Sequence, residues 1–287
     1  MSDIKLVNLL TLEKRQENIF TGQSWDLGFR ALFGGQVLGQ ALAAARLTVD
    51  EDRVAHSFHS YFLLPGDANQ DVSFDVEKVR DGKSFSARRV KAIQNGKTLF
   101  YMTGSFQKAE QGLQHQLGQM PDVPSADSLT SDISYFEKIK EELPKRLQKA
   151  IAYHKPIDTR TVQAIDPVHP DKQTAKRYIW MKSQEQLGGN LSLNQEMLAY
   201  ASDYHFLATC LQPHGISVRD KNLQIATIDH SMWFHHPFNF DDWLLYCVES
   251  PFAGGARGLV RGQFFNTEGT LVASTMQEGL IRLKDES

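Results

Sequence analysis

Two stretches of the chain share one pattern of apolar and polar positions. Gln224–Phe238 (QIATIDHSMWFHHPF) and Ala55–Gly66 (AHSFHSYFLLPG) each contain a His-Ser pair, an aromatic run and then a proline. In both stretches, polar residues interrupt a sequence that is otherwise typical of a buried strand. The same strand signal in both halves of one chain indicates a duplicated fold unit.

The first half of the chain predicts one buried helix followed by strands. Gly34–Ala45 is rich in alanine and almost free of charge, so a helix here has no polar face and should be buried on all sides. Residues 4–20 predict a short amphipathic helix or a loop before it. The Asn95-Gly96 pair marks a hairpin. Four runs have strand patterns: Val54–Leu64, Val72–Val79, Ser84–Gln94 and Lys97–Gln107.

The second half repeats this order. Leu193–Leu211 predicts a helix, and Gln224–Phe238 predicts the strand that follows it. The further strands predicted in this half are Ala175–Lys182, Trp243–Ser250, Leu259–Phe265 and Thr270–Leu283. A helix followed by an antiparallel meander, found twice, predicts an α+β protein with two fused helix-in-sheet units that share one continuous sheet.

The segment between the two halves has a different composition. Residues 108–131 are polar, with glycine, proline and serine, and predict a linker. Ile133–Tyr153 has helical spacing with Pro144 as a break, and residues 155–172 look irregular. We therefore predict an N-terminal unit at 1–107, a linker with a helical segment at 108–174 and a C-terminal unit at 175–287.

Composition and charge exclude several classes of protein. The 287 residues carry a net charge of −3 and no basic run, so nothing indicates a nucleic-acid partner. Cys210 and Cys247 lie in apolar segments and predict reduced, buried thiols, and no Cys/His pair has the spacing of zinc ligands. The sequence contains no apolar run of about 18 residues, so it predicts no membrane span. The N-terminus lacks the features of a signal peptide, so we expect a cytoplasmic protein.

Polar residues within the apolar segments of the second half are candidates for chemistry. Asp203 lies in the predicted helix among apolar neighbours, where an unpaired charge costs several kcal/mol, so it is either a satisfied core carboxylate or a functional one. Strand alternation puts Thr227, Asp229 and Ser231 on one face and His230 on the other. Asp229 and His230 therefore do not face each other as an acid–base pair.

The last predicted strand adds an amide, Gln277, which must bond a partner and can orient a water molecule but cannot act as a base. The other histidines are expected at strand ends or on the rim of the sheet: His56, His59, His235 and His236. No nucleophile motif, phosphate-binding loop or Asp-x4-His-Gly hydratase signature is present. A carboxylate, a hydroxyl and an amide suit direct attack by a bound water molecule.

Motifs over nearly the whole chain, apart from about residues 108–175, resemble those of the bacterial acyl-CoA thioesterase II (TesB-type) family. They include FGGQVLGQALAAA, HSFHSYFLLPGD, YASD, IATIDHSMWFHHPF and STMQEGLIR. The resemblance implies a double hot-dog fold and hydrolysis of acyl-CoA to a fatty acid and CoA without a cofactor. It also implies the catalytic set Asp203, Thr227 and Gln277, and self-association into a dimer or tetramer.

The resemblance leaves other parts of the site as hypotheses. A backbone N–H near Gly34-Gly35 would polarise the thioester carbonyl. Arginines at the sheet rim would meet the CoA phosphates, with these candidates: Arg88, Arg89, Arg257 and Arg261. An alignment anchored on the two prolines places Ala55 opposite Thr227, so the first unit is expected to be a non-catalytic twin. The alternatives are a hot-dog hydratase or dehydratase, and an acyl-CoA-binding sensor without catalysis.

Overall fold

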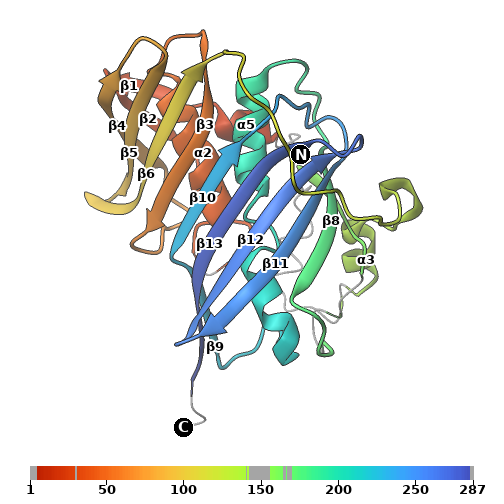
Figure 1. The fold of residues 1–287 in the computed structure, drawn as a ribbon. Coiled ribbons are helices and arrows are strands. Elements are labelled where there is room, and N and C mark those ends of the chain that lie inside the picture. Colours follow the sequence, from red (N-terminus) through yellow and green to blue (C-terminus); the bar gives the residue numbers. More distant parts are fainter. Residues whose placement is uncertain are drawn as a thin grey trace.

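One antiparallel sheet runs through the computed structural model, which describes residues 5–29, 31–139, 141, 156–163, 166 and 170–284. Within these residues the thirteen strands have the order β1-β2-β4-β5-β6-β3-β10-β13-β12-β11-β8-β7, and β9 also pairs with β13 (Figure 1). The strands of the first half are β1 (Glu13–Gln16), β2 (Ile19–Gly22), β3 (Arg53–Phe62), β4 (Val72–Asp81), β5 (Phe85–Gln94) and β6 (Lys97–Lys108).

The second half contributes the remaining strands. They are β7 (Ile157–Thr161), β8 (Lys176–Ser183), β9 (Leu223–Thr227), β10 (Asp229–Phe234), β11 (Leu244–Gly254), β12 (Arg257–Asn266) and β13 (Leu271–Leu283). The helices are α1 (Leu6–Leu10), α2 (Gly34–Arg46), α3 (Asp132–Lys138) and α5 (Leu191–Ala201), with short 3₁₀ segments η1 (Ala126–Ser128) and η3 (Leu207–His214).

The two halves of the sheet have the same strand order when they are followed outward from the middle. The first half runs β3-β6-β5-β4-β2-β1 and the second runs β10-β13-β12-β11-β8-β7. The halves join where β3 pairs with β10, from Tyr61 opposite Asp229 to Ser57 opposite Trp233. The predicted pair of helix-in-sheet units with one continuous sheet is confirmed.

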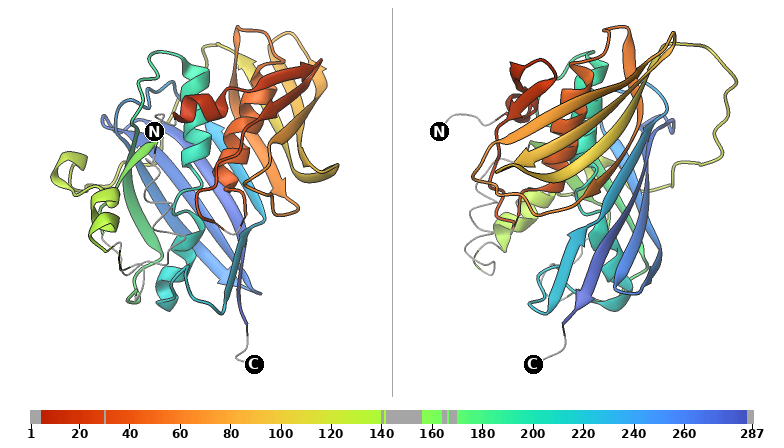
Figure 2. Two further views of the ribbon diagram at one scale, coloured as in Figure 1. Left: turned by 180° about the vertical axis from the view of Figure 1, so that it is seen from behind. Right: turned by 90° about the vertical axis from the view of Figure 1, so that its left-hand side faces the viewer.

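Helices α2 and α5 lie side by side against one face of the sheet, which curves around them (Figure 2). Every residue of α2 from Gly35 to Ala45 is buried, as its lack of a polar face predicts. The helices approach closely at two glycines. A Cβ on Gly39 would lie 3.0 Å from the Glu196 backbone oxygen, and a Cβ on Gly35 would overlap that of Tyr200. Glycine is therefore needed where the helices cross.

One ion pair joins the two central helices. The Arg46 guanidinium bonds the carboxylate of Glu196, which is almost fully buried on α5. Burial raises the pKa of Glu196 to about 7, although Arg46 opposes the shift. The pair therefore gives an ionisable side chain that is buried on α5 a partner on the neighbouring helix.

Several sequence predictions need correction at the ends of the sheet. The described part of the stretch predicted at 4–20 contains α1, then β1 and the start of β2, which pair as a hairpin at the sheet edge. Residues 155–172, expected to be irregular, contain β7, which pairs with β8 at the other edge. The strand predicted at Trp243–Ser250 is longer, because β11 extends to Gly254 and the chain reverses at Gly255-Ala256 with positive φ at both residues.

The linker is described in part. Its beginning has only η1 as a regular element, in keeping with its polar composition. The start of the helix predicted at Ile133–Tyr153 is present as α3, which ends at Lys138, while residue 140 and residues 142–155, with Pro144, lie outside the described residues. The division into 1–107, 108–174 and 175–287 stays a prediction.

Candidate active site

Asp203 lies just beyond the end of α5, which corrects the continuous helix predicted at Leu193–Leu211. The last α-helical hydrogen bond joins the Ser202 N–H to the Leu198 oxygen, and the Tyr204 N–H then bonds Ala201 in a tighter 3₁₀ turn. His205 follows with φ +59° and redirects the chain toward η3. Because α5 ends there, the Asp203 side chain can turn toward the start of α2.

The carboxylate of Asp203 meets the first turn of α2. Its Oδ2 accepts a hydrogen bond of 3.0 Å from the Gly35 N–H, a donor that has no partner within its own helix. A Cβ on Gly34 would lie 2.7 Å from the same oxygen. The glycine pair therefore lets the carboxylate approach, and the positive end of the helix dipole favours its charge. The Gly35 N–H already donates to Asp203, so a substrate carbonyl would have to compete with this carboxylate for it.

The surroundings of Asp203 raise the pKa of its carboxyl above the ordinary value of 3.8. Burial raises the pKa of the carboxyl to about 7, while hydrogen bonding from the Gly35 N–H and the Gln277 side chain lowers it. Asp203 is only partly buried, so the residue is still in contact with solvent. A carboxyl with a pKa near 7 can accept a proton at neutral pH.

The strand predicted at Gln224–Phe238 is divided into β9 and β10 at Ile228. Thr227 lies opposite Gly279 and Ser231 lies opposite Met276, so four residue steps on this side match three steps on β13. This extra residue is a β-bulge, which shifts the alternation of side chains.

Two backbone bonds and one side chain secure the bulge. Ile228 donates its N–H to the Glu278 oxygen and accepts from the Phe62 N–H, each at 2.9 Å. The Asp229 Oδ1 accepts the Glu278 N–H at 2.8 Å. Asp229 therefore satisfies a backbone donor that the bulge leaves without a strand partner.

The bulge brings Thr227 and His230 to the same side chain, although alternation predicted opposite faces. Gln277 on β13 is fully buried, and its Nε2 donates to the Thr227 hydroxyl at 3.1 Å. Its Oε1 lies 2.6 Å from the His230 Nδ1. Gln277 thus bonds Thr227 directly, and hydrogen bonding from its side chain lowers the pKa of Asp203. His230 is the neighbour that sequence reasoning missed, because no sequence signal marks a bulge at Ile228.

The arginines named for the CoA phosphates all have partners in the protein. Arg88 is wrong as a candidate, because its buried guanidinium bonds Thr48, Asp81 and backbone oxygens. The other three form ion pairs with glutamates on the sheet surface: Arg89 with Glu77, Arg257 with Glu278 and Arg261 with Glu249. A phosphate would have to compete with these carboxylates.

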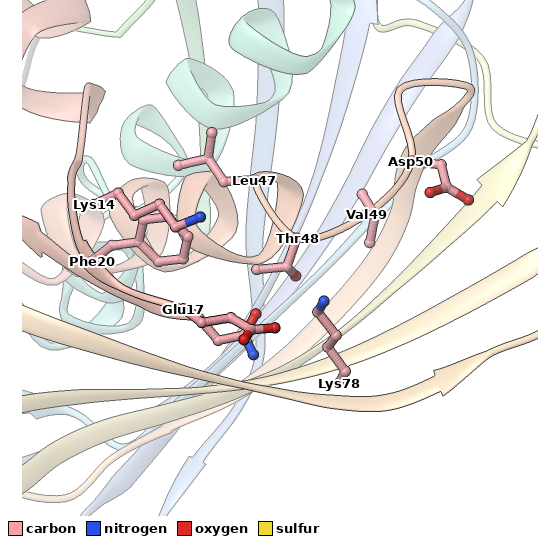
Figure 3. A pocket seen from close by; sticks show the side chains of 9 residues that line it. Lys14, Glu17, Phe20, Leu47, Thr48, Val49, Asp50 and Lys78 are labelled. Carbon is pink, nitrogen blue, oxygen red and sulfur yellow. The ribbon is translucent and has the colours of Figure 1, made fainter.

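Figure 3 shows a surface cavity of about 430 Å³. It is lined by Lys14, Glu17, Asn18, Phe20, Leu47, Thr48, Val49, Asp50 and Lys78. None of the three candidate catalytic residues borders it, and its charges are of both signs. In the described residues, no group of three or more His, Cys, Asp or Glu side chains is placed to hold a metal ion. No helix among these residues has the length and hydropathy to span a membrane.

Comparison with known families covers both halves of the chain. A family model for the acyl-CoA thioesterase N-terminal domain matches residues 21–107, and one for acyl-CoA thioesterase matches residues 149–280. Acyl-CoA thioesterase 2 of Haemophilus influenzae is 44% identical, over 99% of this chain and 100% of that protein. Acyl-coenzyme A thioesterase 8 of Homo sapiens is 37% identical, over 100% of this chain and 91% of that protein.

Solved structures agree with the fold. An acyl-CoA thioesterase II from Mycobacterium marinum superposes with a TM-score of 0.79 at 36% identity, and the match covers 98% of each chain. A hot-dog protein of unknown function from Alicyclobacillus acidocaldarius has a TM-score of 0.77 at 17% identity, over 96% of this chain and 97% of that one. The fold is therefore the expected double hot-dog. Since the likeness to the Haemophilus influenzae protein extends over the whole length of both, this chain belongs to the acyl-CoA thioesterase II (TesB-type) family.

Proposed function

We propose that this protein hydrolyses acyl-CoA thioesters to a fatty acid and free CoA by direct attack of a water molecule. The names of its relatives support the reaction, and the meeting of Asp203, Thr227 and Gln277 supports the mechanism. These three side chains come from the end of α5, from β9 and from β13, and they offer one base and two orienting groups.

In this mechanism Asp203 accepts a proton from the water molecule as its oxygen attacks the thioester carbonyl carbon. Thr227 and Gln277 hold the water so that a lone pair faces that carbon. The C–S bond then breaks, and CoA leaves as a thiolate. A thiolate leaves readily because the pKa of a free thiol is only about 8.5, so no strong acid is required at the sulfur. No covalent enzyme intermediate forms.

The observation that carries the mechanism is the Asp203 carboxyl, held by the Gly35 N–H with a pKa of about 7. A thiol reagent can follow CoA release from acyl-CoA substrates of increasing chain length. Wild-type protein should release one thiol for each acyl chain hydrolysed, and Asp203→Asn should lose almost all of this activity. Saturable acyl-CoA binding without thiol release would instead identify a sensor. Addition of water to an enoyl-CoA would identify a hydratase.

Self-association and a cytoplasmic location remain proposals for this chain. A dimer or tetramer would appear as two or four times the 32.4 kDa protomer in light scattering after size-exclusion chromatography. A protomer mass at micromolar concentration would contradict self-association.

A further inference from the structure

His230 is a fully buried histidine with a hydrogen-bond partner on each ring nitrogen. Its Nδ1 lies 2.6 Å from the Gln277 Oε1, and its Nε2 lies 3.0 Å from the Ser202 hydroxyl. The ring is also packed between aromatic side chains, with centroids 6.1 Å from Phe58 and 5.6 Å from Phe206. The mechanism proposed above gives this residue no role, yet it touches the Gln277 amide.

The contacts of Gln277 decide which hydrogen-bond role Nδ1 has. The Gln277 Nε2 donates to Thr227, so the amide oxygen is the atom that faces the imidazole. An amide oxygen can only accept, and therefore Nδ1 must carry the hydrogen. The second hydrogen on Nε2 is then available to Asp203, which receives hydrogen bonding from this side chain.

The other ring nitrogen fits the same assignment. Burial lowers the pKa of His230 to about 4, so the ring is neutral near pH 7 and Nε2 carries a lone pair. The Ser202 hydroxyl has a single hydrogen and two acceptors within reach, Nε2 and the Ala199 oxygen at 2.8 Å. The Nδ1–H tautomer therefore requires that the Ser202 hydroxyl donate to Nε2 and not to the Ala199 oxygen. Ser202 directly precedes Asp203, so one short turn positions both the base and the histidine.

We propose that His230 is a positioning residue, which holds the Gln277 amide with Nε2 toward Thr227 and Asp203 and with Oε1 turned away from the carboxylate. This role rests on the proposed function. If the amide rotated by a half turn, its oxygen would face the Asp203 carboxylate and its NH₂ would face the Nδ1–H. Both contacts would be repulsive. The tautomer of one buried histidine thereby selects the amide orientation that can hold a water molecule.

The kinetic test uses His230→Phe, alone and combined with Gln277→Ala. Alone, it should lower kcat at least about tenfold and change KM by less than about threefold, because the amide loses its orientation. In the Gln277→Ala background it should cause no further loss. His230→Asn can place an NH₂ group near the position of Nδ1 and should recover much of the loss. Full activity in His230→Phe, or a further loss of the same size beside Gln277→Ala, would overturn the proposal.

His235→Phe is the matched control. Like His230, His235 has a serine hydroxyl at its Nε2, that of Ser274 on β13 at 2.9 Å, but it lies on the exposed side of the sheet. It should retain wild-type kcat. Thermal unfolding of each variant shows whether a loss of activity comes from a loss of folded protein.

A second measurement needs neither a variant nor activity. In protein labelled with ¹⁵N-histidine, the long-range ¹H–¹⁵N spectrum of the His230 ring at pH 7 should show a neutral imidazole protonated on Nδ1. A cationic ring, or a hydrogen on Nε2, would refute the proposed amide orientation. If the wild type releases no thiol while this tautomer is found, the proposed function fails and the orientation of Gln277 stands.

Discussion

The Gly35 N–H donates to the Asp203 carboxylate across the two halves of the chain, at 3.0 Å. Gly35 opens the central helix of the first half, and Asp203 follows the central helix of the second. The base of the proposed reaction therefore depends on a backbone donor that lies 168 positions away in the sequence.

Substitutions at the two glycines that begin α2 should have different effects, one on activity and the other on stability. Gly34→Ala puts a Cβ 2.7 Å from the Asp203 Oδ2, so the carboxylate must move. We expect kcat to fall at least about tenfold with little change in Tm, since a displaced base costs rate more than stability. Gly35→Ala overlaps the Tyr200 backbone and should destabilise the fold by about 1–3 kcal/mol.

The control for both variants is Gly112→Ala, because a Cβ on Gly112 meets nothing within 4 Å. Steady-state kinetics and thermal unfolding of the three proteins check the prediction. Normal kcat in folded Gly34→Ala would show that the carboxylate position is not critical.

Replacement of Asp203 by Asn should lower kcat by about 10²–10⁴-fold, the range expected for a lost general base. Only the ionised carboxylate accepts a proton, so kcat/KM of the wild type should rise as the pH passes about 7, the pKa of Asp203. The residual activity of Asp203→Asn should lack this rise. A pH–rate series for both proteins provides the measurement, with Asp220→Asn as a surface carboxylate control.

The same carboxyl should make the folded protein less stable at higher pH. Its pKa is raised in the folded state above the ordinary value of 3.8, so the folded state binds the proton more tightly than the unfolded state does. This contribution is present in full below about pH 4 and is lost as the pH rises through about 7. Asp203→Asn should therefore have a higher Tm than the wild type at pH 8 but not at pH 5. Comparison at each pH cancels the similar effect of Glu196, and a lower Tm of the variant at pH 8 would contradict the assignment.

The hydroxyl of Thr227 can be tested apart from the shape of its side chain. Thr227→Val keeps the branched shape but cannot accept from the Gln277 amide, and it should lower kcat by about tenfold or more. Thr227→Ser keeps the hydroxyl and should stay within about threefold of the wild type. If one water molecule depends on both groups, the losses from Thr227→Val and Gln277→Ala will combine to less than their product. Equal rates for the Val and Ser variants would exclude a role for the hydroxyl.

The two cysteines should not disturb a thiol-release assay. Burial raises the pKa of Cys210 to about 11 and that of Cys247 to about 12, so neither forms a thiolate near pH 7.5. Native protein should react with a thiol reagent only slowly, and protein unfolded in denaturant should react at two sites for each chain. Rapid labelling of the native protein would contradict this.

Helix and strand patterns were sufficient to predict the duplicated fold. Gly34–Ala45 lacks charge and is buried from Gly35 onward, and strand alternation together with the Asn95-Gly96 hairpin predicts the meander of the first half. The predicted helix and strand boundaries are wrong where a tertiary contact replaces a regular backbone hydrogen bond. Nothing local marks the end of α5 before Asp203, or the bulge at Ile228 that Asp229 completes.

The sequence indicates which residues belong to the candidate site, but it does not indicate which of their side chains contact one another. Asp203 and Gln277 stand out as polar residues in apolar segments, whereas Thr227 is an ordinary strand residue, and it is the family resemblance that selects all three. His230 was assigned to the opposite face, because alternation assumes an unbroken strand. Arg88 was assigned to the rim because a sequence does not reveal that a guanidinium is buried among oxygens from its own chain.

The pairing of β3 with β10 has a consequence for how the protein responds to dilution. Because both strands belong to one polypeptide, each half meets the other at an effective concentration set by the connecting chain and not by the amount of protein present. The donor at Gly35 and the base at Asp203 therefore stay together when the protein is scarce. As far as the contact between the two halves is concerned, the activity of each chain should be independent of protein concentration.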